Sequence, residues 1–235
     1  MSSLAKQFVW GISKKKDGTM KYDKSRTDNS VTGNREKFFK KSGININDTV
    51  TAGLVHDHKV KIVGKRDLKK IISGTDGLIA KDKKIFLTIT TADCLPLYFF
   101  DKEKKVIGLA HAGWRGILEN VAGSMIKAMV KKCTANPKDI IVRIGPHIRP
   151  CHFAVKTDVA RRFGQEREFI VADGDRYFIN LAGIVKKQLM ASGVKAKNIV
   201  ISTDCTYCRW KKYFSYRREG KKGRFMLAYI GMRSD

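Results

Sequence analysis

Two short segments of the chain combine potential metal ligands with residues typical of tight turns. One reads TTADCLP and contains Cys94, and the other reads HAGWRG and opens with His111. His56 follows an earlier apolar run, so a cysteine and two histidines lie at the ends of expected strands. A Cys-His-His set with an open fourth position is typical of catalytic zinc, which polarises a bound water and lowers its pKa. A buried free cysteine and two hydrogen-bonded histidines would explain the same spacing, so both interpretations stay open.

The HAGWRG segment also joins an expected strand to an expected long helix. A helix N-terminus that follows a glycine-containing loop offers free backbone N–H groups and the positive end of the helix dipole, which favour an anion. Gly113 and Gly116 allow a tight turn, and Arg115 adds a planar set of donors suited to phosphate. The alternative is that the glycines serve the turn alone and Trp114 the core, because short glycine motifs are weak without context.

Asp93 and Arg217 are further candidates near these segments. Asp93 adjoins Cys94 and would either orient a ligand and move a proton or cap a turn. Arg217 and Arg218 follow the aromatic run YFSY and would face either solvent or the pocket, where arginine suits recognition of an anion.

The five cysteines indicate a reducing compartment. Their number is odd and no signal peptide is apparent, so we expect reduced thiols in a cytoplasm-like environment. Cys205 and Cys208 form a CxxC motif with three open roles: redox chemistry, half of a structural zinc site completed by Cys151 and His152, or packing and pocket lining.

The elements that must position these residues can be predicted from hydrophobic patterning. Short runs rich in β-branched and aromatic residues predict strands at 8–12, 50–55, 60–63, 85–91, 97–100, 106–110, 140–144, 199–202 and 225–230. Helical periodicity predicts helices at 116–132 and 180–191, with shorter ones at 34–41 and 157–163. Many strands with few long helices predict one mixed α/β (α+β) domain over residues 1–235.

Composition excludes several classes of protein. The chain has 235 residues, of which 43% are hydrophobic, so it suits a packed globule rather than a disordered or collagen-like chain. No apolar run approaches the roughly 20 residues of a membrane span, and no GxGxxG motif indicates a dinucleotide. The net charge of +26 would attract nucleic acid non-specifically, but no nucleic-acid motif is present.

Taken together, the motifs resemble the laccase-domain (YfiH-like) family, described as polyphenol oxidase and as multifunctional purine nucleoside phosphorylase. The resemblance covers nearly the whole chain. It rests on HAGWRG, ADCLP upstream of it, a Val-His pair before that, the terminal CT…YFSYRR…GR run, and the shorter pieces NRE, TDGLI and IGP.

This resemblance implies a layered α/β/β/α sandwich with one zinc ion held by His56, Cys94 and His111. The implied activity is phosphorolysis of adenosine, inosine, guanosine and methylthioadenosine to a free base and ribose 1-phosphate, with adenosine deamination as a side activity. It also implies that Cys205 lies near the active centre. The chain departs from the family at Leu54 and Asp57, where the family usually has glutamine and glycine, and this departure bears on substrate range.

On this interpretation the partners are a purine nucleoside and phosphate, with the protein as a monomer or a homodimer and no membrane contact. Copper-dependent oxidation of phenols is an alternative activity, although one Cys-His-His set cannot hold several coppers and would accept copper mainly in vitro. Editing of cell-wall precursors is another. A basic nucleic-acid-binding protein is the alternative from a different class, and its affinity would fall steeply with salt.

Overall fold

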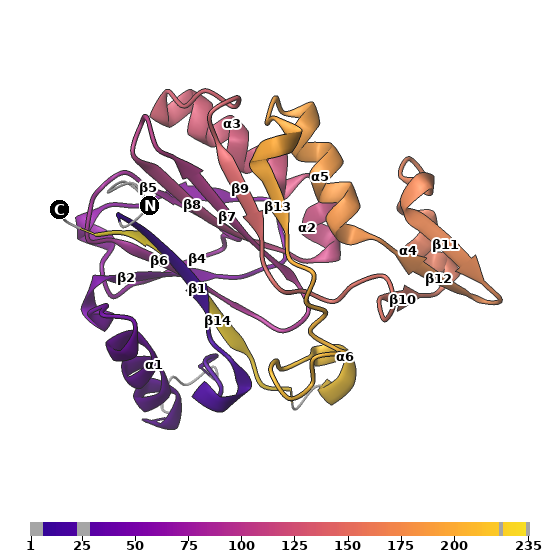
Figure 1. Cartoon of the computed structure of the whole chain (residues 1–235), viewed down its shortest axis with the longest axis horizontal. Coiled ribbons are helices and arrows are strands. Elements are labelled where there is room, and N and C mark those ends of the chain that lie inside the picture. Colours follow the sequence, from indigo (N-terminus) through magenta and orange to yellow (C-terminus); the bar gives the residue numbers. More distant parts are fainter. Residues whose placement is uncertain (1–6, 23–28, 221–222, 234–235) are drawn as a thin grey trace.

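The computed structural model describes residues 7–22, 29–220 and 223–233. Two β-sheets lie face to face, and helices cover the outer face of each (Figure 1). Helices α3 and α5 lie on one side and α1 on the other, so the layers follow the order α/β/β/α. The layered mixed fold predicted above is therefore confirmed.

The larger sheet has the order β13-β9-β7-β8-β5-β3. Its strands are β13 (Ile199–Ile201), β9 (Ile141–Ile144), β7 (Leu95–Asp101), β8 (Val106–Ala112), β5 (Gly77–Ala80) and β3 (Val60–Ile62). Strands β7 and β8 form a central antiparallel hairpin whose residues are all buried, as expected for nearly continuous apolar runs covered on both faces. Their register places Pro96 opposite His111, which brings the segment before β7 close to the end of β8.

The second sheet has the order β1-β14-β6-β2-β4. Its strands are β1 (Phe8–Ile12), β14 (Met226–Met232), β6 (Phe86–Thr91), β2 (Thr49–Gly53) and β4 (Ile71–Ser73). An apolar core fills the space between the sheets; it includes Val50, Leu87, Ile89, Leu109 and Ile230. Burial of these side chains on the inner faces holds the two sheets together.

Two helices pack on the larger sheet. Helix α3 (Val121–Cys133) and helix α5 (Leu181–Ala191) bury an apolar stripe against it, and the 3.6-residue period of that stripe is what made them predictable. On the opposite side, helix α1 (Asn29–Lys41) buries Phe38 and Phe39 against the smaller sheet. Helix α1 begins before the predicted start at residue 34.

The predicted helix at 116–132 is wrong in one respect, because it is two helices. Helix α2 (Trp114–Leu118) ends before Asn120, whose left-handed backbone (φ 57°) breaks the chain direction. The Asn120 side chain then caps α3 by accepting a hydrogen bond from Gly123 N. Asparagine tolerates this conformation better than most residues, so the break costs little.

A small third sheet extends from the sandwich beside helix α4 (Figure 1). It comprises β10 (Ala154–Val155), β12 (Arg176–Ile179) and β11 (Ile170–Asp173), none of which was predicted. Helix α4 (Thr157–Arg161) agrees with the predicted 157–163 segment, and α6 (Tyr216–Glu219) follows the last long loop. Within the described residues, no helix is long and apolar enough to cross a bilayer.

Candidate metal and substrate site

Three potential ligands from separate parts of the chain meet at one end of the sandwich. His56 comes from the loop after β2, Cys94 from the turn before β7, and His111 from β8. One ligand atom from each lies within 4.8 Å of the other two, and the imidazole rings of His56 and His111 meet edge to face at 4.9 Å. The structure thus brings together all three residues predicted to hold a metal.

Asp76 orients two of these ligands from behind. Its side chain is fully buried, and Oδ1 accepts hydrogen bonds from His111 Nδ1 (2.9 Å) and His56 N (3.1 Å). Its other oxygen, Oδ2, accepts from Val55 N and Asp57 N, both at 3.0 Å. Because His111 donates through Nδ1, its Nε2 is left as the ligand atom, an arrangement common among metal-binding histidines.

The charges at this site favour the ligand form of Cys94 but the protonated form of His111. Burial raises the pKa of the Cys94 thiol, but the nearby His111 and His56 outweigh it and lower that pKa to about 6. Burial likewise lowers the pKa of His111, but Cys94 and Asp76 outweigh it and raise that pKa to about 9. The thiol is therefore ready to bind as a thiolate at neutral pH, whereas His111 must release its Nε2 proton to a metal.

Gly113 leaves room beside the three ligands. A Cβ atom at this position would lie 3.2 Å from His56 Cδ2, 3.3 Å from Cys94 Sγ and 3.5 Å from His111 Cε1. A thiolate with two imidazoles suits zinc and also copper. The residues present therefore fit a single metal ion with one position left for another group.

A pocket of about 1030 Å³ opens onto these ligands. Its wall is apolar in large part, with Ile71, Trp114, Ile148, Phe153, Val155 and Leu181. Among the described residues, the same wall carries five Lys or Arg side chains, Lys21, Arg35, Arg115, Lys156 and Arg217, against the two acidic residues Asp93 and Asp158. An apolar pocket with an excess of positive charge suits a flat ring attached to an anion.

Asp93 lies in the pocket wall with its carboxylate already engaged. Its oxygens accept hydrogen bonds from Thr206 Oγ1 (2.6 Å), Ser215 Oγ (2.9 Å) and Arg217 N (2.7 Å). Asp93 has a left-handed backbone (φ 84°) and is buried. These contacts fasten the last long loop to the Cys94 turn, so the side chain positions neighbouring residues; its predicted role in proton transfer stays a prediction.

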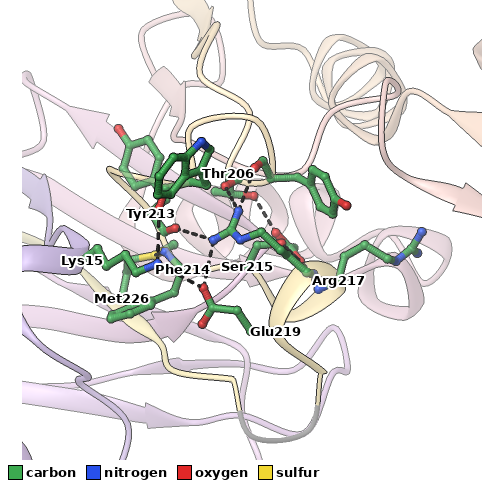
Figure 2. Close-up of polar contacts among 12 residues, drawn as sticks. Lys15, Thr206, Tyr213, Phe214, Ser215, Arg217, Glu219 and Met226 are labelled. Atoms are coloured by element: carbon green, nitrogen blue, oxygen red, sulfur yellow. Dashed lines mark hydrogen bonds and ion pairs between the residues drawn. The ribbon is translucent and has the colours of Figure 1, made fainter.

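The two predicted arginines both line the pocket. Arg115 is exposed on α2, with its guanidinium 4.3 Å from the Trp114 ring centroid. Arg217 donates to the backbone oxygens of His152 (3.1 Å) and Ala154 (2.7 Å), and Figure 2 shows its side chain extending away from Thr206 and Ser215. Arg217 therefore links the last loop to the β10 segment while facing the pocket.

Gly116 and Cys205 are not among the residues that line this pocket. A Cβ at Gly116 would come within 2.9 Å of the Asp57 backbone oxygen, so this glycine lets α2 approach the loop that carries His56. Cys205 instead lies in a second cluster of potential ligands with Cys151, His152 and Cys208. Their assignment to substrate or phosphate binding stays a prediction.

Asp76 and Arg218 are important residues for which sequence analysis proposed no specific role. Arg218 braces the last loop by donating to the backbone oxygens of Thr206 (3.0 Å), Tyr207 (2.7 Å) and Tyr213 (2.8 Å), while also pairing with Glu219. No local pattern marks either residue. Asp76 entered the sequence analysis only as part of the TDGLI segment on which the resemblance partly rests. The adjacent arginines could not be told apart from sequence, although Arg217 lines the pocket and Arg218 holds the last loop.

Leu54 and Asp57, the two residues that depart from the family pattern, lie at different places relative to the pocket. Leu54 lines the pocket, whereas Asp57 faces the surface and pairs with Lys59 at 2.9 Å. Lys59 and the backbone N–H of His58 lower the pKa of Asp57 to about 2. The departure that can affect a substrate is therefore Leu54.

The chain is similar to known proteins along most of its length. A family model described as multi-copper polyphenol oxidoreductase laccase matches residues 10–233. The chain belongs to this family. Among members of the laccase family, the Bacillus subtilis protein named purine nucleoside phosphorylase YlmD is 32% identical over 219 residues, covering 88% of this chain and 78% of the relative. Human purine nucleoside phosphorylase LACC1 is 26% identical, covering 86% of this chain and 48% of its own length.

Solved structures of laccase-family proteins have the same fold. Bacillus licheniformis YfiH superposes with a TM-score of 0.92 at 27% identity, covering 96% of this chain and 93% of its own. YlmD from Geobacillus stearothermophilus gives a TM-score of 0.91 at 28% identity, covering 99% and 94%. The layered sandwich is thus shared along nearly the full length of these chains.

Proposed function

We propose that this protein is a zinc-dependent purine nucleoside phosphorylase. It would convert adenosine, inosine, guanosine or methylthioadenosine, with phosphate, to a free base and ribose 1-phosphate. The observation that carries this proposal is the convergence of His56, Cys94 and His111 at a pocket that is both apolar and basic. The names of the relatives, which include several purine nucleoside phosphorylases, support the reaction class.

His56, Cys94 and His111 would hold the zinc ion, with Asp76 keeping the imidazole of His111 in the required tautomer. Zinc at this position would supply Lewis acidity toward an oxygen of the substrate. A single set of ligands with one remaining position suits catalysis better than a purely structural role, because structural zinc sites use four protein ligands.

The pocket wall supplies the remaining binding functions. The apolar side chains of Phe153, Val155 and Ile148 offer a surface on which a purine ring can lie. Arg115 and Lys156 are exposed and line the same pocket, so they can approach phosphate without leaving a buried charge. Helix α2 has five residues, so we assign phosphate binding to these side chains more than to the helix dipole.

In the reaction, an oxygen of hydrogen phosphate forms a bond to C1′ of the ribose as the bond from C1′ to the purine nitrogen breaks. The bonding electron pair leaves with the purine, which takes up a proton, and the proton of hydrogen phosphate balances this uptake. Positioning phosphate and nucleoside together reduces the entropic cost of bringing two reactants into line. Positive side chains along the wall stabilise the phosphate in the required place.

The same ligands could support two other reactions. Adenosine deamination would use water in place of phosphate at the same centre. Copper-dependent oxidation of phenols is favoured by the family's description and by ligands that also accept copper. Among the described residues, however, the ligand clusters include one Cys-His-His set at the pocket, which would hold one copper rather than several.

Product analysis tests the proposal. Zinc-loaded protein purified at high salt, to remove nucleic acid, is incubated with adenosine in the presence and absence of phosphate. We expect adenine and ribose 1-phosphate only when phosphate is present, and no turnover by Cys94→Ala. Cys133→Ala is the matched control, since Cys133 is a free cysteine at the end of α3, outside the pocket lining. Turnover by a Cys94→Ala protein whose zinc content equals that of the unchanged protein would contradict the ligand assignment.

A further inference from the structure

A second cluster of potential metal ligands lies between two loops that the proposed reaction does not use. Cys151 and His152 come from the segment after β9, and Cys205 and Cys208 come from the loop after β13. One ligand atom from each residue lies within 4.8 Å of the other three. The three cysteines are free thiols, so none of them is committed to a disulfide.

The separations between these atoms match those around one tetrahedral ion. Cys151 Sγ lies 3.7 Å from Cys205 Sγ and 3.8 Å from Cys208 Sγ. His152 Nδ1 lies 3.2 Å from Cys151 Sγ and 3.3 Å from Cys208 Sγ. Zinc bonds of about 2.3 Å to sulfur and 2.0–2.1 Å to nitrogen, at tetrahedral angles, place two sulfurs about 3.8 Å apart and a sulfur and a nitrogen about 3.6 Å apart. The sulfur separations agree closely, and the nitrogen needs only a small outward shift.

We propose that Cys151, His152, Cys205 and Cys208 bind a structural zinc ion, separate from the ion at the pocket. All four positions of a tetrahedral ion would be filled by protein, which is the arrangement of structural Cys₃His zinc sites. The two residues between Cys205 and Cys208 give the CxxC spacing that is common in such sites.

The surroundings of two of the four ligands favour this role. Burial raises the pKa of the Cys205 thiol, but hydrogen bonds from the backbone of Cys208, Arg149 and Tyr207 outweigh it and lower that pKa. Donors of this kind stabilise a thiolate, which is the form that binds zinc. The imidazole of His152 stacks on the Tyr207 ring, with centroids 4.0 Å apart and planes 18° apart, so the ring is held with Nδ1 toward the sulfurs.

The overall charge also fits. Three thiolates and one Zn²⁺ leave a net charge of −1 on the filled cluster. The same two loops carry Arg149, Arg209 and Lys212 against one acidic residue, Asp204, which pairs with Arg209 and Lys212. Arg217 also donates to the backbone oxygen of His152. A cluster with this small negative charge is better accommodated in such a basic environment than at an acidic surface.

This zinc ion would stabilise part of the pocket wall. Thr206, between the two cysteines of the CxxC motif, donates to Asp93 at 2.6 Å. On the other side of the cluster, the backbone oxygens of His152 and Ala154 hold Arg217. Joining the two loops through a metal would therefore fix Arg217 and the Cys94 turn relative to each other, without contact between the metal and substrate.

Metal analysis of the whole protein tests this inference independently of phosphorolysis. Protein purified with zinc under reducing conditions, dialysed and measured for metal and protein should contain two zinc ions per chain. The double variant Cys151→Ser/Cys208→Ser should contain one zinc ion, because it keeps only the ion at the pocket. Cys94→Ala should also contain one zinc ion, because it keeps only the structural ion. Cys133→Ala should retain two. A double variant that holds as many zinc ions per chain as the unchanged protein would overturn the proposal.

Cobalt substitution gives a second measurement that does not depend on folding of the double variant. In Cys94→Ala protein loaded with cobalt, the remaining ion should show the strong sulfur-to-cobalt charge-transfer absorption and the visible bands of a tetrahedral site with three thiolates. Absence of these bands would contradict the proposed zinc site. A disulfide in freshly reduced protein, seen as a chain mass lower by two hydrogens than that of the fully reduced chain, would also contradict it. Loss of nucleoside turnover with both metals still bound would instead contradict the proposed function alone.

Discussion

Replacement of Asp76 by asparagine tests how the pocket ligands are held. The carboxylate accepts two hydrogen bonds at each oxygen, from His56 N and His111 Nδ1 on one side and from Val55 N and Asp57 N on the other. The asparagine NH₂ group cannot accept a hydrogen bond. Whichever way the amide turns, two donors lose their acceptor at a buried position.

The expected cost follows from those two contacts. A hydrogen bond to a charged group contributes about 1.5–3 kcal/mol, so two of them give a loss of about 3–6 kcal/mol in the free energy of unfolding. An amide turned to keep the backbone contacts of Val55 and Asp57 would present NH₂ to His111. Loss of a carboxylate behind a metal-binding histidine lowers metal affinity by about 10–100-fold.

Both effects can be measured on the same protein. Denaturant titration of metal-free protein gives the free energy of unfolding, and competition with a chromogenic chelator gives the zinc affinity. Asp101→Asn is the matched control. Asp101 is also fully buried, but in the described structure its Oδ2 has no partner and its Oδ1 accepts from Lys104 N alone. We expect Asp101→Asn to change stability by less than about 1 kcal/mol. Unchanged zinc affinity and stability in Asp76→Asn would refute the reasoning.

Three other predictions follow from the site. Gly113→Ala should lower zinc affinity, because the new methyl group would crowd the ligands. The free energy of unfolding should change little, because the backbone of Gly113 has a φ of −75°, which alanine also adopts. Competition with a chelator measures the zinc affinity. Arg115→Ala should raise the KM for phosphate about 10–100-fold, the equivalent of one charged contact, while the nucleoside KM changes little. In metal-free protein the two shifted pKa values should nearly cancel, so the free energy of unfolding should change little between about pH 6 and pH 9. The lowered pKa of Cys94 contributes stability that is complete above about pH 9 and is lost as pH falls through about 6, whereas the raised pKa of His111 contributes stability that is complete below about pH 6.5 and is lost as pH rises through about 9. Melting temperature against pH measures this, and Cys94→Ser should instead lose stability as pH rises from about 6.5, because Asp76 still raises the pKa of His111.

Much of the sandwich could be predicted because its strands are runs of buried β-branched and aromatic residues. Strands β6, β7 and β8 are buried along their whole length and stand out in the sequence. Strand β11 was missed because three of its four residues are exposed, so no apolar alternation marks it. The break at Asn120 was missed because the apolar period continues from α2 into α3 across it.

The metal ligands at the pocket could be predicted from sequence, but the residue that positions them, Asp76, could not. Cys94 directly precedes β7 and His111 lies near the end of β8, so both lie at the same end of one hairpin. The short-range sequence pattern together with the resemblance was therefore enough to pair them. Asp76 acts through contacts with residues about twenty and thirty-five positions away in sequence, which no local pattern encodes. The CxxC motif had three open roles, one of them a zinc site completed by Cys151 and His152, and the fold brings these four residues together.

One isotope experiment tests the central claim most directly. Zinc-loaded protein is incubated with adenosine and ordinary phosphate in water labelled with heavy oxygen, and the products are weighed by mass spectrometry. Phosphorolysis predicts adenine and unlabelled ribose 1-phosphate, since the oxygen on C1′ comes from phosphate. Adenine with free ribose in place of ribose 1-phosphate would show attack by water on C1′, and labelled inosine without adenine would show deamination. Either of these as the main product would contradict the account.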